Sequence, residues 1–371
     1  MVRYAQVTGW GMYVPSTVIT NDAFVRMRLE TTDDWITSQT GIEQRRLVSH
    51  DEATSDMALK AAREALRVAG AHAGDIDLIV LATCTPDHVM PATASIVQER
   101  LGARDAGAAD VNAACAGFTY ALSLGAAQIE SGRAKQVLVI GADELSIHLN
   151  WKDRSTCILF GDGAGAVVLR AGKEPGVMSS TMGSDGSGAG LLTIPGGSRA
   201  RVNGNAAAAD GYLQMNGPQI FRWATQKMSN AAERVIRSSG LKSDQVDLFI
   251  PHQANMRIIE ATAKRVGLAP ERVYANVGRY GNTSAASIPI ALCEALDAGM
   301  LKAGDNLVLT SFGAGLSWAA VALRWTVAAP AHRPPWAPLR RTLESQVAAM
   351  RSAIKRQERK VRASIDERLG R

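Results

Sequence analysis

ALKAAREALRVAG (58–70) and MSNAAERVIRSSG (228–240) are two stretches of the sequence that match each other when position 58 is aligned with position 228. Each has the pattern of a helix followed by a glycine, Gly70 or Gly240, where a left-handed C-cap is expected. The same constant offset extends over about 80 residues and indicates a duplicated α/β fold. We predict two similar halves, residues 1–172 and 173–327. The offset pairs Ala61 and Ala62 with Ala231 and Ala232, Arg67 with Arg237, Asp77 with Asp247, Leu78 with Leu248, Asn112 with Asn282, and Ala121 and Leu122 with Ala291 and Leu292.

Four nearly continuous apolar runs alternate with helical patterns and predict strands. Runs of this kind are typical of parallel strands that helices cover on both faces. In such sheets, functional residues gather beyond the carboxyl ends of the strands, so the site is expected where strand ends of the two halves meet. The runs are IDLIVLAT (76–83), QVLVIGA (136–142), VDLFIPH (246–252) and NLVLTSF (306–312).

The composition is that of a globular protein, and its positive charge is unevenly distributed. The 371 residues are 46% apolar and 20% charged, and no apolar run reaches the roughly 18 residues that a membrane-spanning helix needs. A net charge of +6 and a pI near 9.2 favour an acidic partner such as nucleic acid, anionic lipid or an acidic protein. From residue 331 onward, however, eleven Lys and Arg accompany four Asp and Glu, whereas residues 1–330 hold 30 basic and 31 acidic side chains. The two halves are therefore nearly neutral.

The basic character belongs to a C-terminal extension. AAPAHRPPWAP (328–338) holds four prolines and predicts a linker, and residues 339–371 form a basic tail that is either helical or disordered. Three roles stay open for this tail: a solvated extension, an oligomer contact, or recruitment to an anionic surface or partner that remains unknown. An interrupted heptad-like stripe follows Leu343, Val347, Met350, Ile354 and Val361.

The cysteines and the N-terminal residues favour the cytoplasm. The four cysteines show no C-x-x-C spacing and no nearby histidine pair, so neither a zinc site nor a disulfide framework is expected. The first residues, MVRYAQVTGWGMYVP, lack the pattern of a signal peptide. We therefore expect a cytoplasmic protein without a metal.

Cys115 is the candidate nucleophile. It lies in DVNAACAGFTYALSLGAAQIESG (110–132), where we predict a strand that ends near Val111 and a helix that begins close to Cys115. A thiol at a helix N-terminus lies at the positive end of the helix dipole, which favours the nucleophilic thiolate. Small neighbours leave room for a substrate carbonyl. The alternative is a buried structural cysteine.

His252 and Asn282 are candidate partners of this thiol. His252 ends the run VDLFIPH, and we expect a helix to begin directly after it. Asn282 lies in RYGNTSAASIPIALCEAL and pairs with Asn112 at the offset that relates the two halves. Duplication therefore predicts that the loops around Cys115 and Asn282 are neighbours where the halves meet. The alternatives are that His252 has a structural role and that Asn282 caps a helix.

Two glycine-rich stretches follow predicted strand ends or lie between strands. SFGAGLSWAA (311–320) could direct backbone amides toward a developing oxyanion. GDGAGA (161–166) lacks the spacing of a dinucleotide fingerprint, and we interpret it as a turn between strands.

At this point several motifs together resemble one family. NAACAGF, PHQANMRI, GNTSAAS and FGDGAGAVVL occur in the order and spacing of β-ketoacyl-acyl-carrier-protein synthase III, within the thiolase-like condensing enzymes. The resemblance covers about residues 1–327 and includes DWITSQTGIEQRR (34–46) and GSDGSGAGLLTIPGGSR (183–199). It implies a duplicated thiolase-like fold in five α-β-α-β-α layers.

The resemblance also implies roles for individual residues. Cys115 would accept the acyl group, with His252 and Asn282 completing a triad, and the backbone amides of Cys115 and Ala314 would form an oxyanion hole. Ala314 departs from the glycine usual in the family, and Gln39 departs from a frequent basic residue. The remaining positions are Thr31, Trp35, Arg154, Gly217 and Asn255 for coenzyme A, Met90 for the acyl pocket of the dimer partner, and Arg222, Arg257, Lys264 and Arg265 for the carrier protein.

The implied reaction is a decarboxylative condensation that initiates fatty acid synthesis. An acyl-coenzyme A primer would acylate Cys115, and malonyl-acyl-carrier protein would then lose CO2 and attack the acyl group. The resemblance implies a homodimer and no cofactor, since acyl-coenzyme A is a substrate. One alternative is a condensing enzyme or acyltransferase of specialised metabolism. Another is a binding or scaffold protein that works through its basic tail.

Overall fold

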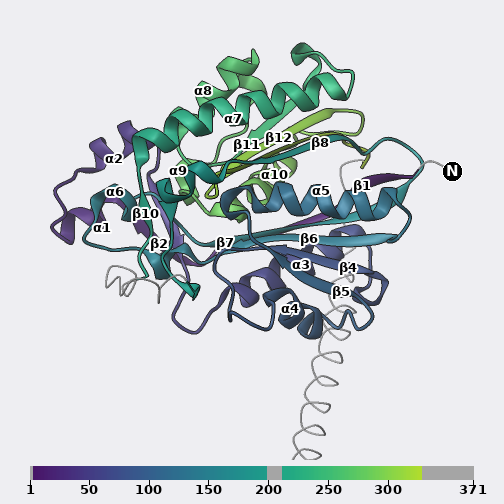
Figure 1. The fold of residues 1–371 in the computed structure, drawn as a ribbon, viewed down its shortest axis with the longest axis horizontal. Helices are drawn as coiled ribbons and strands as arrows, with labels where there is room; N and C mark the ends of the chain where they lie inside the picture. The colour runs from purple at the N-terminus through teal and green to yellow at the C-terminus, as the bar shows by residue number, and fades with distance from the viewer. Residues whose placement is uncertain (1–2, 199–210, 328–371) are drawn as a thin grey trace, which may run out of the picture.

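The structure is a computed structural model that describes residues 3–198 and 211–327 (Figure 1). The predicted linker, 328–338, and the predicted basic tail, 339–371, lie outside the described residues. Within the described part of the chain, none of the helices is both long enough and apolar enough to cross a bilayer.

The first sheet has five strands in the order β1-β7-β6-β4-β5. Strand β4 pairs in parallel with β5 and β6, whereas β7 is antiparallel to β1 and β6. This sheet therefore has three parallel strands, β6, β4 and β5, at one side, and β7 lies antiparallel between β6 and the edge strand β1. Its strands are β1 (Tyr4–Tyr13), β4 (Leu78–Ala82), β5 (Gly107–Val111), β6 (Gln136–Asp143) and β7 (Gly163–Gly172), and the helices between them are α3 (Thr54–Ala69), α4 (Thr93–Leu101), α5 (Gly117–Glu130) and α6 (Arg154–Cys157).

The second sheet has four strands in the order β11-β12-β13-β8. Strands β11 and β12 are parallel, and β13 is antiparallel to both β12 and β8. The strands are β8 (Val177–Ser184), β11 (Leu248–Pro251), β12 (Asn306–Gly313) and β13 (Ser317–Arg324), and the helices are α7 (Gly217–Ser238), α8 (Met256–Val266), α9 (Val277–Tyr280) and α10 (Ser287–Asp297).

Two small ribbons and two short helices lie at one end of the molecule (Figure 1). Thr32 caps α2 by accepting a hydrogen bond from the Trp35 amide at 3.1 Å. The elements are β2 (Thr17–Thr20) paired with β3 (Gln44–Leu47), β9 (Leu192–Thr193) paired with β10 (Gln214–Met215), and helices α1 (Asn21–Arg26) and α2 (Asp33–Thr40).

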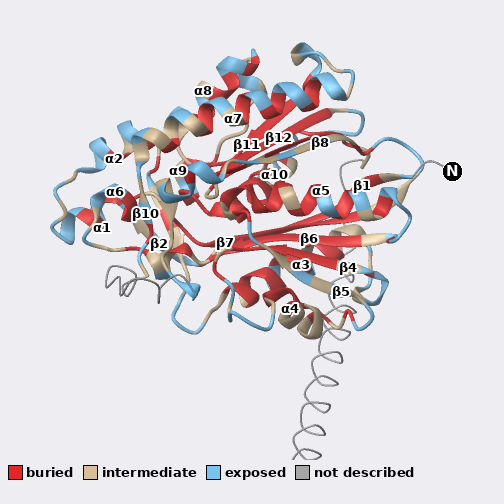
Figure 2. Ribbon diagram, viewed as in Figure 1, coloured by how far each residue is buried: buried red, intermediate tan, exposed pale blue. Residues whose placement is uncertain are grey.

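The elements stack in five layers, as the fold class predicted (Figure 1). Helices α3 and α4 cover the outer face of the first sheet, and α7 and α8 cover the outer face of the second. Helices α5 and α10 lie between the sheets and contact both of them. Buried residues therefore concentrate in the inner strands of the two sheets and in this central helix layer (Figure 2).

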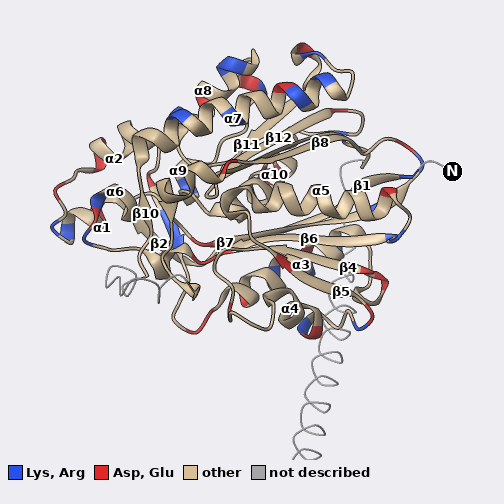
Figure 3. Cartoon of the chain, viewed as in Figure 1, with Lys and Arg blue, Asp and Glu red and all other residues tan. Residues whose placement is uncertain are grey.

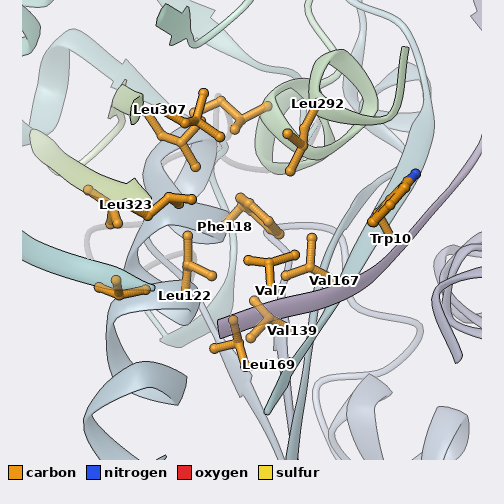
Figure 4. Close-up of a cluster of buried hydrophobic side chains, with 14 of the residues drawn as sticks. Val7, Trp10, Phe118, Leu122, Val139, Val167, Leu169, Leu292, Leu307 and Leu323 are labelled. Carbon is orange, nitrogen blue, oxygen red and sulfur yellow. The ribbon is translucent and has the colours of Figure 1, made fainter. Parts of the chain in front are cut away.

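The largest buried apolar cluster surrounds the central layer (Figure 4). Phe118 and Leu122 of α5 and Leu292 of α10 pack between side chains of the two sheets. Fully burying one side chain of this size contributes about 1.5–3 kcal/mol to folding, so this cluster fixes α5 and α10 between the sheets. The sheet residues labelled in Figure 4 are Val7, Trp10, Val139, Val167, Leu169, Leu307 and Leu323.

The constant offset found in the sequence holds between the elements of the two halves. Strand β4 begins at Leu78 and β11 at Leu248, and β6 spans Gln136–Asp143 where β12 spans Asn306–Gly313. Both glycines predicted to follow helices have left-handed φ angles, 62° at Gly70 and 75° at Gly240. The last strand of the first sheet along the chain ends at Gly172, and the first strand of the second sheet begins at Val177. We therefore propose that the boundary between the predicted halves, 1–172 and 173–327, lies in the short connection between these two strands.

Two local predictions need correction, and one predicted helix is longer than its pattern. The second helical stretch, 228–240, is the last part of α7, which begins at Gly217 behind Asn216, whose side chain accepts from the Gln219 amide. The helix after His252 begins four residues later, at Met256. GDGAGA is not a turn between strands, since it follows α6 and runs directly into β7.

We expect Gly141→Ala to destabilise the contact between the two halves. A Cβ on Gly141 of β6 would lie 2.3 Å from the carbonyl oxygen of Ala285, which is backbone and cannot move alone. Overpacking of this kind costs about 1–3 kcal/mol, which lowers the melting temperature by several degrees. Thermal unfolding of this variant is compared with that of Gly74→Ala, where a Cβ meets no atom within 4 Å. Equal melting temperatures of the two variants would contradict the prediction.

Candidate active site

A tight turn places Cys115 at the end of β5. The Asn112 side chain accepts a hydrogen bond from the Ala114 amide at 3.2 Å, and Ala114 has a left-handed φ of 46°. A short 3-10 turn, Ala114–Ala116, follows, and α5 begins at Gly117. Cys115 is therefore next to a helix N-terminus, as predicted, and it is buried, with 7% of the residue exposed.

The same turn recurs in the second half around Asn282. The Asn282 side chain accepts a hydrogen bond from the Ser284 amide at 2.8 Å, and Ser284 has a φ of 51°. A 3-10 turn, Ser284–Ala286, again leads into a helix, α10. Positions 112 and 114 thus match positions 282 and 284 in backbone conformation as well as in sequence spacing. Two equivalent turns form the centre of the candidate site.

The two turns contact each other, as duplication predicted. Burial raises the pKa of the Cys115 thiol, and the nearby side chains of Ser284 and Asn282 oppose part of this rise. Since the Asn282 side-chain oxygen accepts within its own turn, its amide nitrogen remains to donate toward the thiol and toward a substrate oxygen.

The electrostatic state of Cys115 differs from the prediction. Burial raises the pKa of the Cys115 thiol to about 11, and the nearby Asp143 carboxylate raises it further. These effects exceed the opposing contributions of Ser284 and Asn282. The helix N-terminus was expected to favour the thiolate, yet the buried thiol is protonated at neutral pH.

We expect the alkylation of Cys115 by iodoacetamide to rise about tenfold for each pH unit between pH 7 and 10. With a pKa of about 11, the thiolate fraction grows in this proportion over the whole interval. Peptide mass spectrometry after timed alkylation separates Cys115 from the other cysteines. A rate that is already constant above pH 7 would show a thiolate in the resting protein and contradict the prediction.

His252 is buried directly after β11, with 3% of the residue exposed. Its backbone amide donates to the Thr310 carbonyl at 2.8 Å, which extends the pairing of β11 with β12. Burial lowers the pKa of the imidazole to about 3, so the ring is neutral at physiological pH. The ring nitrogen Nδ1 lies 2.6 Å from the Ser287 hydroxyl oxygen. Ser287 is the first residue of α10 and thereby connects His252 to the Asn282 turn.

The end of β12 closes the site beside Cys115. A Cβ on Gly313 would lie 2.7 Å from the Cys115 amide nitrogen and 2.9 Å from the Ala113 carbonyl, so only glycine permits this approach. Ala314 follows immediately, and its φ is not in the left-handed region. The alanine is therefore accommodated without backbone strain where the resemblance implied a glycine.

A buried carboxylate supports the Asn282 turn. Asp143, at the end of β6, accepts hydrogen bonds from the Cys84 amide at 2.7 Å and from the Ala285 amide at 3.0 Å. The hydroxyl groups of Thr83 and Thr85 donate to the same carboxylate at 3.0 and 3.2 Å. Asp143 therefore ties the end of β4 to the Asn282 turn. Sequence reasoning missed Asp143, Ser284 and Ser287, although the repeat places Ser284 opposite Ala114.

Comparisons with known proteins show the family of the chain. Models of 3-oxoacyl-[acyl-carrier-protein] synthase III match residues 109–186 and, for its C-terminal part, residues 236–325. The β-ketoacyl-[acyl-carrier-protein] synthase III of Roseiflexus sp. RS-1 is 47% identical over 329 residues, covering 88% of this chain and 100% of the relative.

The chain belongs to the β-ketoacyl-acyl-carrier-protein synthase III family.

Two solved structures extend the comparison. The 3-oxoacyl-(acyl carrier protein) synthase III of Pseudomonas aeruginosa PAO1 is 44% identical, with a TM-score of 0.82, and covers 88% of this chain and 100% of its own. The priming β-ketosynthase of the R1128 polyketide biosynthetic pathway is 35% identical, with a TM-score of 0.84, and covers 89% of this chain and 98% of its own. The predicted thiolase-like fold class is confirmed.

Other predicted positions of the synthase III family lie at the end of the molecule that holds α2 and α8. The Arg154 guanidinium lies 4.8 Å from the centre of the Trp35 ring and donates to the Glu30 carbonyl, beside Thr31. The Thr31 hydroxyl is buried without a hydrogen-bond partner in the described residues. Trp35 and Arg154 thus already form a stacked pair, and binding of coenzyme A to them remains a prediction.

Gln39 makes contacts that sequence reasoning did not foresee. Its side-chain oxygen accepts a hydrogen bond from Arg257 at 3.2 Å, and its carbonyl accepts one from Asn255 at 3.1 Å. Asn255 also caps α8, whereas Gly217 begins α7. In place of a basic side chain, this chain therefore has a hydrogen-bonded link between α2 and α8.

The predicted carrier-protein residues are exposed on two adjacent helices. Arg222 lies on α7, and Arg257, Lys264 and Arg265 lie on α8 (Figure 3). All four therefore lie on two helices that contact each other over the second sheet. Met90 lies elsewhere, in the loop before α4, and is 85% exposed in the single chain.

In the described residues, no group of three or more His, Cys, Asp or Glu could hold a metal ion.

Proposed function

We propose that this protein catalyses the condensation that initiates fatty acid synthesis. An acyl-coenzyme A primer and malonyl-acyl-carrier protein are its substrates, and a β-ketoacyl-acyl-carrier protein is the product. Relatives that align over their full length bear the name of this activity, and the chain has their family fold. The meeting of the Cys115 turn with the equivalent Asn282 turn, beside His252, is the observation that carries the proposal.

In the first half-reaction the Cys115 sulfur attacks the thioester carbonyl of the primer. The C–S bond to coenzyme A breaks, and the departing thiolate takes up the proton that Cys115 loses. The backbone amides of Cys115 and Ala314 stabilise the oxyanion, since Gly313 brings the end of β12 against the Cys115 amide. The product is an acyl-enzyme.

In the second half-reaction the malonyl group loses CO2, and its bonding electrons form an enolate. His252, through Nε2–H, and the Asn282 amide donate hydrogen bonds to the enolate oxygen. Because burial keeps the imidazole neutral, it stabilises this oxygen without being a strong acid. The enolate carbon then attacks the acyl group, and the Cys115 thiolate departs and regains a proton.

The experiment follows the two half-reactions separately. The protein is incubated with a panel of acyl-coenzyme A primers, and intact-mass spectrometry looks for the acyl adduct on Cys115. Malonyl-acyl-carrier protein is then added, and CO2 release and the β-ketoacyl product are measured. Absence of any adduct with every primer would overturn the proposal, and competition among primers in one assay defines the preferred chain length and branching.

A second candidate is priming or acyl transfer in specialised metabolism. The structural similarity to a priming β-ketosynthase of a polyketide pathway, with a TM-score of 0.84, favours it. An acyltransferase would form the same adduct but would not decarboxylate malonyl-acyl-carrier protein. A priming condensing enzyme would decarboxylate it but prefer the carrier protein of its own pathway.

We further propose a cytoplasmic homodimer that needs no added cofactor. The exposed Met90 loop is then the segment that reaches the partner's acyl pocket.

Truncation at residue 328 tests the role of the tail. Unchanged turnover and unchanged mass of the dimer, with loss of lipid or nucleic-acid binding, would identify the tail as a separate recruitment segment. Loss of the dimer would identify it as an oligomer contact.

A further inference from the structure

We propose that Ser287 is a positioning residue that holds His252 in the tautomer with the proton on Nε2. This inference rests on the proposed function, because it concerns the donor that faces the enolate. It starts from one contact, the distance of 2.6 Å between the Ser287 hydroxyl and Nδ1 of His252.

The hydrogen bond between Ser287 and His252 is buried, and the Ser287 hydroxyl has no second partner in the described residues. Ser287 and His252 are both buried, and bulk water does not reach the bond between them. Over residues 3–198 and 211–327, His252 is the one hydrogen-bond partner that the structure gives for the Ser287 hydroxyl. The direction of this single bond therefore determines whether the hydroxyl proton is satisfied.

A neutral imidazole has one donor and one acceptor nitrogen. If Nδ1 carried the proton, it would donate to Ser287, and the buried hydroxyl proton would have no acceptor. Leaving such a group unpaired disfavours that tautomer by roughly 5–150-fold. If Ser287 donates to Nδ1 instead, the bond is satisfied, and the ring proton is on Nε2.

The fold fixes the position of Ser287 relative to His252. Ser287 is the first residue of α10, five positions after Asn282 and directly after the 3-10 turn Ser284–Ala286. Asp143 holds that turn through the Ala285 amide at 3.0 Å. The element that presents the Asn282 amide therefore also fixes the proton of His252, so that both donors point to one substrate oxygen.

The tautomer has a consequence for the first half-reaction. Nε2 carries a proton and has no free lone pair to take one from Cys115. The resting thiol is then not activated by His252. Loss of the Ser287 hydroxyl should accordingly impair decarboxylation and condensation, which need the donor, much more than acylation of Cys115.

The experiment combines a spectroscopic and a kinetic measurement on the full chain. Long-range ¹H–¹⁵N spectra of protein labelled with ¹⁵N-histidine report the tautomer of each neutral ring, and His252→Gln assigns the signal. We expect the Nε2–H pattern in the unaltered protein. An Nδ1–H pattern there would overturn the inference, whatever the activity is.

The kinetic arm uses Ser287→Ala, with Ser287→Thr to restore a hydroxyl. We expect the alanine variant to lose about 5–100-fold in kcat for CO2 release, with Cys115 acylation changed less than threefold, and the threonine variant to recover part of the loss. Ser229→Ala removes another buried helix hydroxyl, which donates to the Thr225 carbonyl, and controls for destabilisation alone. CO2 release by folded Ser287→Ala at the unaltered rate would also overturn the inference. No condensation by the unaltered protein would instead contradict the proposed function, and the tautomer measurement would still stand.

Discussion

Cys115→Ala removes the acyl adduct completely and lowers condensation from acyl-coenzyme A by at least about 10³-fold. Covalent catalysis needs the sulfur, and no water or hydroxyl at this position can store the acyl group as a thioester. Release of CO2 from malonyl-acyl-carrier protein should persist in this variant, because His252 and Asn282 are unchanged. Mass spectrometry of the intact protein and a CO2 assay measure the two effects.

Cys84→Ser is the matched control for this prediction. Cys84 is the second thiol near the site, and its sulfur lies 4.0 Å from the Ser284 hydroxyl. Burial raises the pKa of Cys84 well above its ordinary value. Unlike Cys115, Cys84 is not followed directly by a helix N-terminus, so it should not compete as a nucleophile. Retention of the adduct in Cys115→Ala, or its loss in Cys84→Ser, would place the acyl group on the wrong residue for the proposed mechanism.

Asn282→Asp lowers decarboxylation and condensation by about 10²–10³-fold, with little effect on the formation of the Cys115 adduct. The carboxylate retains the oxygen that accepts from the Ser284 amide at 2.8 Å, so the turn is preserved. It replaces a donor with a negative charge at the place where the enolate charge develops, and loss of one such donor costs about 2.7–4 kcal/mol. Single-turnover rates of adduct formation and CO2 release separate the two half-reactions.

The repeat offers the control for this substitution. Asn112 forms the equivalent turn, with its side chain accepting from the Ala114 amide, but it is exposed to solvent. Asn112→Asp therefore adds the same charge without placing it against the enolate, and its effect on CO2 release should be much smaller. Equal losses in the two variants would show that the effect of Asn282→Asp is a general electrostatic one.

Much of the fold was predictable because the information is local and repeated. One constant offset along the chain predicted two related halves, and the turns at Asn112 and Asn282 share one conformation because the same side-chain-to-backbone bond forms in each. The boundaries were less predictable. Helix α7 begins eleven residues before the stretch that indicated it, since its N-terminal cap, Asn216, lies outside the periodic pattern.

Sequence alone thus predicted which chemical groups the candidate site contains: a thiol and an imidazole, each after a strand end, and an amide in the loop after α9. Only the tertiary structure decided the protonation states of the thiol and the imidazole. The thiol is protonated because burial excludes water from it and because Asp143, at the end of β6 in the same sheet, lies near it, and the imidazole is neutral because it is buried. Its partner, Ser287, lies 35 residues away in the chain. Solvation and hydrogen bonding depend on distance in space, which the order of residues does not record.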